Sequence, residues 1–296
     1  MGSMREHFMV IVPHQDDEVL MTAGVIRKAV KEQVPVEVVM ATNGDYGCTD
    51  HSKGWERLRE SIRGLEILGL DAAHFHILGY ADTGMPAGES FLTHLYEHRT
   101  GCVHGEDRIW PSSCGTETYG LPEKEEYHMQ RHGEHAPYCR WSFRSDLKEI
   151  IWEKRPTRIY TTSEFDLHGD HSGLYKFVCE VLDELAAEAG YAPELYVSVI
   201  HSCAGDENWP KRGTAVYDCP EGFEAAGGTK ASLNGRKGLK WDARICLALP
   251  EEMCTAMGEY NLKRQALQQH ETALEPNAAE YLMSFIKDEE IFWRIR

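Results

Sequence analysis

The stretch MVIVPHQDDEVL, residues 9–20, joins an apolar run to one histidine and three consecutive acids. The residues from His7 to Val12 have the length and the branched side chains of a buried strand. Neighbouring carboxylates repel one another, and burying them unpaired costs free energy. We therefore expect a positively charged partner at the end of this strand, together with other residues of the chain that meet it there.

Strands and helices alternate along most of the chain, as judged from runs of branched residues and from apolar residues at helical spacing. The expected strands are 7–12, 34–42, 74–80, 157–163, 194–202 and 243–249, and the expected helices are 18–32, 55–70, 143–156, 174–190, 250–270 and 278–292. This alternation predicts an α/β fold with a mostly parallel sheet and covering helices. We expect one domain over residues 4–296.

The alternation stops between residues 84 and 140, which are rich in Gly, His, Cys and Tyr. A segment of this size without periodicity is usually functional, so we interpret it as a large inserted lid over one edge of the fold. Its aromatic residues either line a sugar subsite or form a small core of their own: Trp110, Tyr119, Tyr127, Tyr138 and the adjacent Trp141. The loop GGTKASLNGRKG (227–238) lacks the order of a phosphate-binding loop, and we expect it to be mobile and near the pocket.

Within this insertion, four residues have a spacing that metal ligands often show: His128, His132, His135 and Cys139. A second, structural zinc is conceivable there. The alternative is that these side chains pack within an irregular segment, because no C-x-x-C pair anchors such a site.

Composition and charge limit the classes of partner. The 296 residues carry a formal net charge of -17, which argues against nucleic acid, since nucleic-acid binders need basic patches. Nine cysteines form no C-x-x-C pair, and the chain begins without an apolar leader. We therefore expect reduced thiols and a cytoplasmic location. No run approaches the roughly 18 apolar residues of a membrane span.

Two polar clusters, PHQDDE (13–18) and DLHGDH (166–171), each follow an expected strand and precede an expected helix. Ligands of open α/β sheets bind outside the carboxyl ends of the strands, so both clusters can converge on one crevice. Together they offer His14, Asp17 and His171 as a set of two histidines and one carboxylate, which suits a catalytic divalent metal. Asp16 would then face the water and accept its proton.

His168, on the same turn as His171, would stand across the site to donate a proton or stabilise an oxyanion, with Asp166 or Asp170 orienting its imidazole. These parts suit metal-assisted hydrolysis of an amide or ester. Helix capping is the simpler interpretation of either cluster alone, with Asp16 or Asp17 capping one helix and Asp170 the other. The pairing of the two clusters favours the metal site.

At these residues the chain resembles the LmbE-like, or PIG-L, family of zinc deacetylases, which carry A/P-H-x-D-D-E after the first strand and H-x-D-H after a later one. The resemblance implies a Rossmann-like fold, one zinc ion per chain and hydrolytic removal of acetyl from an N-acetylglucosamine-type sugar or conjugate. By motif, the metal ligands would be His14, Asp17 and His171, the general base Asp16, and the oxyanion-stabilising or acid residue His168, supported by Asp170.

Further segments resemble family motifs that face the substrate: TNGDYG (42–47), RLRE (57–60) and GYAD (79–82). They imply substrate contacts at Asp45, Arg57 and Asp82. Gln15 and Gly169 replace the proline usual in each metal motif, and His270 is followed by Glu-Thr-Ala instead of the usual S-Q-like pair. The insertion has no counterpart in compact members, so the acceptor sugar is the least transferable part of the resemblance.

Three other functions compete with this one. An amidase acting on another N-acyl amine or thiol conjugate would use the same groups. A non-haem iron enzyme also uses two histidines and a carboxylate, but usually as H-x-D on an antiparallel barrel. A non-catalytic sugar- or metal-binding module would need neither Asp16 nor His168. Fe²⁺ or another divalent ion can replace zinc, and the aglycone, the native metal and a homo-oligomeric state stay open.

Overall fold

The computed structural model describes residues 5–97, 108–221, 223, 238–274 and 278–296. Nearly all of the loop 227–238, together with His98, Cys102 and His104 of the insertion, lies outside these ranges. Within them, seven strands form one sheet in the order β3-β2-β1-β4-β5-β7-β6. The strands are β1 (Phe8–Val12), β2 (Val36–Thr42), β3 (Phe75–Tyr80), β4 (Arg158–Thr162), β5 (Glu194–Ser198), β6 (Ile245–Ala248) and β7 (Glu289–Arg294).

The first five strands are parallel and the last two are antiparallel additions at one edge. The mostly parallel sheet predicted from the alternation is therefore confirmed. Strand β1 lies in the interior of the sheet between β2 and β4, with Val10 opposite Val38 and Tyr160. All five residues of β1 are buried, as expected for a strand that helices cover on both faces.

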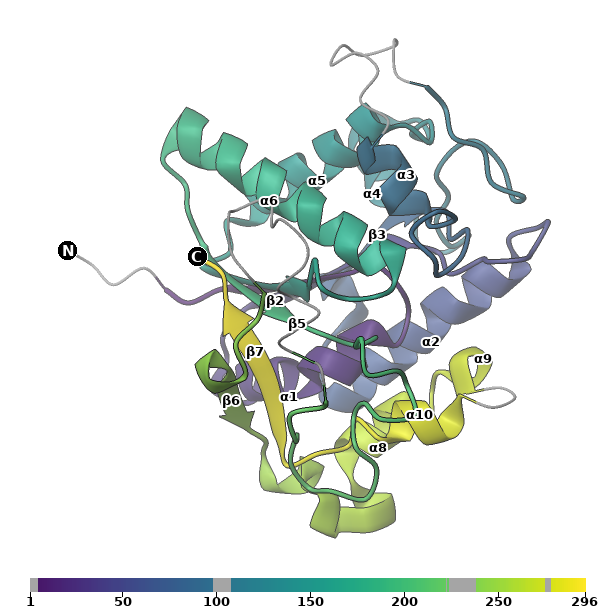
Figure 1. The fold of residues 1–296 in the computed structure, drawn as a ribbon. Helices are drawn as coiled ribbons and strands as arrows, with labels where there is room; N and C mark the ends of the chain where they lie inside the picture. Colours follow the sequence, from purple (N-terminus) through teal and green to yellow (C-terminus); the bar gives the residue numbers. More distant parts are fainter. Residues whose placement is uncertain (1–4, 98–107, 222, 224–237, 275–277) are drawn as a thin grey trace.

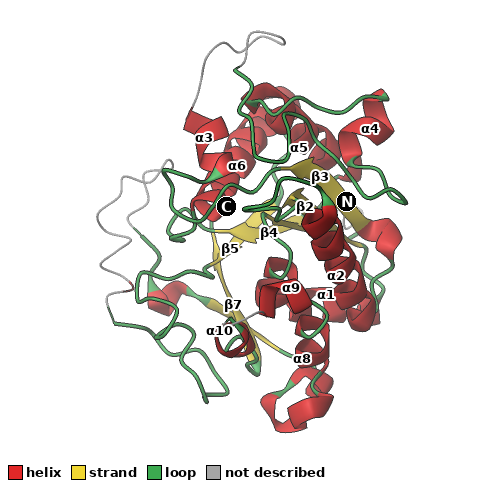
Figure 2. Cartoon of the chain, turned by 90° about the vertical axis from the view of Figure 1, so that its right-hand side faces the viewer, coloured by secondary structure: helices red, strands yellow, loops and turns green. Residues whose placement is uncertain are grey.

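Helices cover both faces of the sheet (Figure 1). One layer holds α1 and α2 with the short C-terminal helices, and the other holds α3 to α6; the turned view in Figure 2 shows the same two layers. The helices are α1 (Asp17–Glu32), α2 (Ser52–Leu68), α3 (Phe91–Glu97), α4 (Tyr127–His132), α5 (Arg140–Lys154), α6 (Gly169–Ala189), α8 (Leu262–Leu267), α9 (Glu271–Leu274) and α10 (Ala279–Met283). None of the helices in the described ranges is long and apolar enough to cross a membrane.

The C-terminal region differs from the prediction. A single helix over 250–270 was wrong: two 3-10 turns, Glu251–Met253 and Thr255–Tyr260, precede the short α8. Gly258 takes a non-helical conformation (φ 55°, ψ -122°), and Asn261 then starts α8 by accepting the N–H of Arg264. A helix over 278–292 was also wrong, because only α10 forms.

The segment after α10 becomes β7, which pairs with both β5 and β6. Its apolar residues Ile291, Phe292 and Trp293 are buried, and their side chains suit a strand that lies between two neighbours. The favourable pairing partners are distant in sequence, so a local helical pattern gave the wrong element here. Strand β5 is also shorter than expected, ending at Ser198.

The described part of the segment 84–140 contains two short helices, α3 and α4, and several isolated β-bridges. Helix α3 packs against α6. Tyr119, Tyr127 and Tyr138 are buried, and the ring of Tyr138 lies 5.9 Å from that of Tyr80 in the central sheet, centroid to centroid. These three tyrosines therefore pack inside the protein, but Tyr127 and Tyr138 belong to the main core and not to a separate core of the insertion.

The ligand-like residues of this segment make separate contacts. His128 contacts Asp146, His132 contacts Glu149 and His135 contacts Glu126, while the Cys139 thiol lies 3.1 Å from the Ser142 hydroxyl. The set His128, His132, His135 and Cys139 is thus not assembled around one point. Only His128 and His132 lie close enough to share an ion, together with Asp146.

Candidate active site

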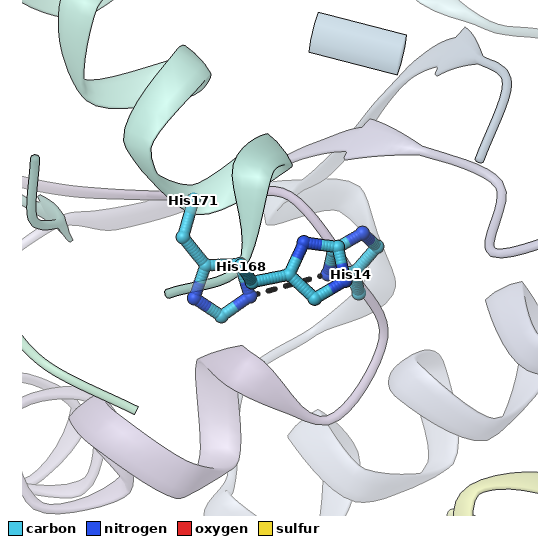
Figure 3. A group of neighbouring side chains, drawn as sticks. All are labelled: His14, His168 and His171. Carbon is cyan, nitrogen blue, oxygen red and sulfur yellow. Dashed lines mark hydrogen bonds between the residues drawn. The ribbon is translucent and has the colours of Figure 1, made fainter. Parts of the chain in front are cut away.

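The two metal-motif segments meet at the carboxyl edge of the sheet, because β1 and β4 are adjacent and parallel. His14 lies in the turn between β1 and α1, and His168 and His171 lie at the start of α6. Figure 3 shows the three imidazoles from these two segments pointing toward one another, with a dashed line between His14 and His171. All three side chains are buried.

Three atoms of this cluster form a nearly equilateral triangle. Nδ1 of His14 lies 3.3 Å from Nε2 of His171 and 3.4 Å from Oδ2 of Asp17. The third side, from Oδ2 of Asp17 to Nε2 of His171, is 3.3 Å. Ligands at the usual zinc bond lengths of about 2.0–2.1 Å in tetrahedral geometry stand about 3.3–3.4 Å apart. The donor types and the spacing of these three residues therefore fit a zinc ion.

His168 offers an alternative third ligand, since it lies with His14 and His171 within 4.8 Å. We favour Asp17, because its oxygen lies at zinc-ligand spacing from both histidine nitrogens, 3.4 and 3.3 Å, and because a carboxylate neutralises part of the charge of a divalent ion. The side chain of Asp17 is also fixed by the backbone N–H of His14, which donates to Oδ2 at 3.0 Å.

Two buried carboxylates stand behind the histidines. Oδ2 of Asp170 lies 3.2 Å from Nε2 of His14, and its Oδ1 accepts the backbone N–H of Leu92. Oδ2 of Asp166 lies 3.0 Å from Nδ1 of His171, an ion-pair contact rather than a well-aligned hydrogen bond. Such partners orient a metal-binding imidazole and set which of its nitrogens faces the metal.

This arrangement corrects one expectation. Asp170 was expected to support His168, but its carboxylate supports His14, and only its backbone N–H reaches His168, at Nδ1. The capping interpretation also fails for the carboxylates. The side chain of Asp16 makes no capping hydrogen bond, and the side chain that caps α6 is the imidazole of His168.

The charges in the triangle balance one another. Burial opposes charge on His14, but its hydrogen bonds to Asp17 and Asp170 outweigh burial and raise the pKa of His14 to about 10. Burial is likewise outweighed at Asp17, where His171 and His14 hold the pKa of the carboxyl well below its usual range. A divalent cation would take the place of the imidazole protons, since metal ligands bind in their deprotonated forms.

Asp16 lies beside the triangle and does not belong to it. Its side chain is 13% exposed, and Oδ2 lies 3.7 Å from the Arg57 guanidinium. Burial and the charge of Asp17 raise the pKa of Asp16 to about 7, against the opposing effect of Arg57. A carboxylate whose pKa is near neutral has the property of an efficient general base.

His168 stands on the other side of His14, with the two ring centroids 4.4 Å apart. Burial, and the positive charges of His14 and His171, lower the pKa of His168 far below its usual value. Its Nδ1 accepts the N–H of Asp170. A neutral imidazole with this tautomer carries its proton on Nε2, where it can serve as a hydrogen-bond donor.

The three residues expected at the substrate lie around the same edge but make different contacts. Both carboxylate oxygens of Asp45 accept a hydrogen bond, one from the N–H of Asp82 and the other from the hydroxyl of Tyr119. Arg57 donates to the carbonyls of Gly44 and Gln15. Asp82 lies close to His14 and Asp170. Asp45 and Arg57 thus hold the turns in place, while Asp82 is the nearest of the three to the metal triangle.

His201 belongs to the site but was missed. It follows β5, its ring centroid lies 5.4 Å from that of His171 and 5.7 Å from that of His168, and its backbone N–H donates to Asp166. Tyr281 stacks on its other side. The expected strand 194–202 included His201, so the rule that identified the other clusters, polar residues after a parallel strand, did not reach it. In the structure β5 ends at Ser198, and His201 follows that end.

Comparisons with known proteins agree with this geometry. Residues 9–182, more than half of the chain, match the family model GlcNAc-PI de-N-acetylase (PIG-L). A diacetylchitobiose deacetylase of Thermococcus kodakarensis is 31% identical over 104 residues, which cover 32% of this chain and 38% of that protein's length.

Two solved structures share the fold. The A40926 pseudoaglycone deacetylase Dbv21 is 16% identical with a TM-score of 0.54, and 98% of this chain and 97% of that one are covered. The zinc-inhibited form of the teicoplanin deacetylase Orf2 is 15% identical with a TM-score of 0.53, with 97% of each chain covered. Identities this low show the fold alone, whereas the family model covers both metal motifs. The chain belongs to the PIG-L family of GlcNAc-PI de-N-acetylases.

Proposed function

We propose that this chain is a metal-dependent hydrolase that removes the N-acetyl group from an N-acetylglucosamine-type sugar or sugar conjugate. The observation that carries the proposal is the triangle of His14, Asp17 and His171 with a separate carboxylate, Asp16, and a separate neutral imidazole, His168, beside it. The names of the relatives, a diacetylchitobiose deacetylase and a pseudoaglycone deacetylase, support the substrate class.

The metal would be held by His14, Asp17 and His171, with Asp170 and Asp166 orienting the two imidazoles. Two nitrogens and one oxygen suit zinc, and Fe²⁺ or another divalent ion is compatible with the same donors. When bound, the metal would polarise the amide carbonyl and lower the pKa of the attacking water.

The residues of the chain would carry the proton transfers. Asp16 accepts the proton of the water as the oxygen of that water bonds to the amide carbon. His168 donates a hydrogen bond to the carbonyl oxygen, which gains negative charge. The C–N bond then breaks as the nitrogen takes up the proton that Asp16 had accepted, so the products are acetate and a free amine.

An amidase acting on another N-acyl amine or a thiol conjugate would use the same groups, so only substrates separate the two. The test is acetate release by zinc-loaded protein from a panel of N-acetylhexosamines, N-acetylated disaccharides and thiol-sugar conjugates. We expect release from at least one amino sugar, and release about 10²–10⁴-fold slower with the Asp16→Asn variant. Metal-loaded protein that releases no acetate from any amino sugar would contradict the proposal.

The cellular setting is part of the same proposal. An odd number of cysteines without a C-x-x-C pair supports a reducing, cytoplasmic environment. None of the eight described cysteines forms a disulfide with another described cysteine. Thiol titration of protein purified from reducing and from oxidising medium, with activity measured in parallel, tests this location. Light scattering of the purified protein would determine whether it forms a homo-oligomer.

A further inference from the structure

Asp16 has a backbone conformation that few residues with a side chain adopt, with φ at 109° and ψ at -34°. Such a conformation persists only where its surroundings hold it in place. We propose that Glu18, backed by His270, is a positioning residue that holds Asp16 in this conformation and so aims its carboxylate. The inference deepens the proposed function and rests on it, because it takes Asp16 as the general base.

Both polar groups of the peptide unit between Gln15 and Asp16 make a hydrogen bond to a side chain. Oε2 of Glu18 accepts the N–H of Asp16 at 3.0 Å. The carbonyl of Gln15, on the opposite edge of the same peptide plane, accepts a hydrogen bond from Arg57 at 2.8 Å. Two opposed hydrogen bonds fix the rotation of a planar peptide group, and this rotation determines the backbone angle at Asp16.

The second oxygen of Glu18 faces a histidine from the far end of the chain. Oε1 of Glu18 lies 3.6 Å from Nε2 of His270, and both side chains are fully buried. Among the described residues, neither nitrogen of His270 makes a hydrogen bond, so its approach to Glu18 is a contact without a hydrogen bond. Helix α2 makes room for the ring with Gly64, where an added Cβ would stand 3.0 Å from Nε2. The His270 ring therefore restrains the side of Glu18 that does not contact Asp16.

Glu60 shows what a purely structural carboxylate looks like in the same layer. It is as deeply buried as Glu18, and its two oxygens accept the backbone N–H and the hydroxyl of Thr272, which fastens α9 to α2. One oxygen of Glu18 instead accepts the backbone N–H of Asp16, the proposed base. A buried carboxylate is costly, so its position beside Asp16 indicates a role in placing that residue.

The test compares Glu18→Met, which removes the acceptor at similar size, with Glu18→Gln, which keeps one. We expect Glu18→Met to lower kcat by about 10- to 100-fold, as misplacement of a catalytic group by about 1 Å does, with KM and metal content unchanged. Glu18→Gln should stay within about threefold of the wild type. In an Asp16→Asn background, Glu18→Met should lower kcat little further, because the residue through which it acts is already lost.

The matched control is Glu60→Met, which should lower the melting temperature and leave the hydrogen bond from the Asp16 N–H to Glu18 in place. His270→Leu is a second variant in case Glu18→Met does not fold; it removes two unpaired ring nitrogens, and we expect a smaller loss of kcat. A kcat unchanged in both Glu18→Met and His270→Leu would overturn the inference. An equal fold-loss of kcat for Glu18→Met in the wild-type and in the Asp16→Asn background would also overturn it.

The resonance of the Asp16 amide proton provides a readout that does not need turnover. An N–H that donates to a carboxyl oxygen resonates downfield, so the signal should move upfield in Glu18→Met and stay in Glu18→Gln. If the wild type released no acetate from any compound, the proposed function would fail. This signal would still show whether Glu18 accepts the N–H of Asp16. An Asp16 amide resonance unaffected by either substitution would overturn the inference.

Discussion

Nδ1 of His14 and Nε2 of His171 lie 3.3 Å apart, although the two residues are 157 positions apart in the chain. The pairing of β1 with β4 brings them together, because both residues follow the carboxyl ends of adjacent parallel strands. Each imidazole has a buried carboxylate at its other nitrogen. The geometry of the pair is thus fixed by the sheet and by two backing acids.

The first prediction concerns the metal ligands. We expect His14→Ala, Asp17→Ala and His171→Ala to lose the bound divalent ion, because each removes one corner of the triangle. His168→Ala should retain it. Elemental analysis after dialysis against buffered zinc measures the ion per chain. Retention by all three ligand variants, or loss in His168→Ala, would contradict the assignment.

The second prediction separates the adjacent aspartates. Asp16→Asn keeps the size of the side chain but cannot accept the proton, so we expect full metal content and a kcat lower by about 10²–10⁴. Asp17→Asn should weaken metal binding, and added zinc should restore part of its activity. Metal analysis and acetate release measure both. Metal loss in Asp16→Asn with rescue by zinc would reverse the two roles.

The third prediction follows from the contact between Asp170 and His14. Asp170→Asn replaces the carboxylate that orients the imidazole, and we expect metal affinity to fall by about 10- to 100-fold. Competition with a fluorescent zinc chelator measures it. Asp183→Asn, an exposed aspartate on the same helix that pairs with Arg296, is the control and should change nothing. Unchanged affinity with reduced kcat would instead favour support of His168 by Asp170.

The fourth prediction concerns Tyr119, which connects the insertion to the turns that carry Asp45 and Asp82, the proposed substrate contacts. Its hydroxyl donates to Asp45, whose other oxygen holds the N–H of Asp82. Tyr119→Phe removes a hydrogen bond to a charged group, worth about 1.5–3 kcal/mol, and should loosen Asp82. We expect KM for the amino sugar to rise at least tenfold with kcat nearly constant. Steady-state kinetics would contradict this by showing an unchanged KM.

The fifth prediction concerns stability. Lys263 and Glu290 form a fully buried ion pair against α1, where Lys263 donates to the carbonyl of Leu20 and Glu290 accepts the N–H of Gly24. Lys263→Met leaves the carboxylate buried without its partner and should lower the free energy of unfolding by about 3–5 kcal/mol.

Denaturant titration measures this loss. The control is Lys31→Met, whose exposed pair with Glu252 should contribute less than about 1 kcal/mol. Equal, small losses in Lys263→Met and Lys31→Met would show that the buried pair does not support the fold.

The sequence by itself determined the order of the main strands and helices in the first two thirds of the chain and the position of both metal motifs. Local periodicity identified β1 to β4 and the helices α1, α2 and α5, but not α3 and α4 of the insertion. The rule that ligands bind at the carboxyl ends of parallel strands placed His14 and His171 together. Both inferences depend on short-range pattern and on a general property of parallel sheets, and neither needs the distances between side chains.

Only the tertiary structure decided which acid backs which imidazole and how the chain ends. Asp170 contacts His14 instead of His168, and residues 289–294 become a strand because β5 and β6 are available as partners. Glu18 meets His270 across 252 positions of sequence. Such contacts depend on where whole elements pack in space, and a spacing along the chain carries no information about the separation of two side chains that approach from different elements.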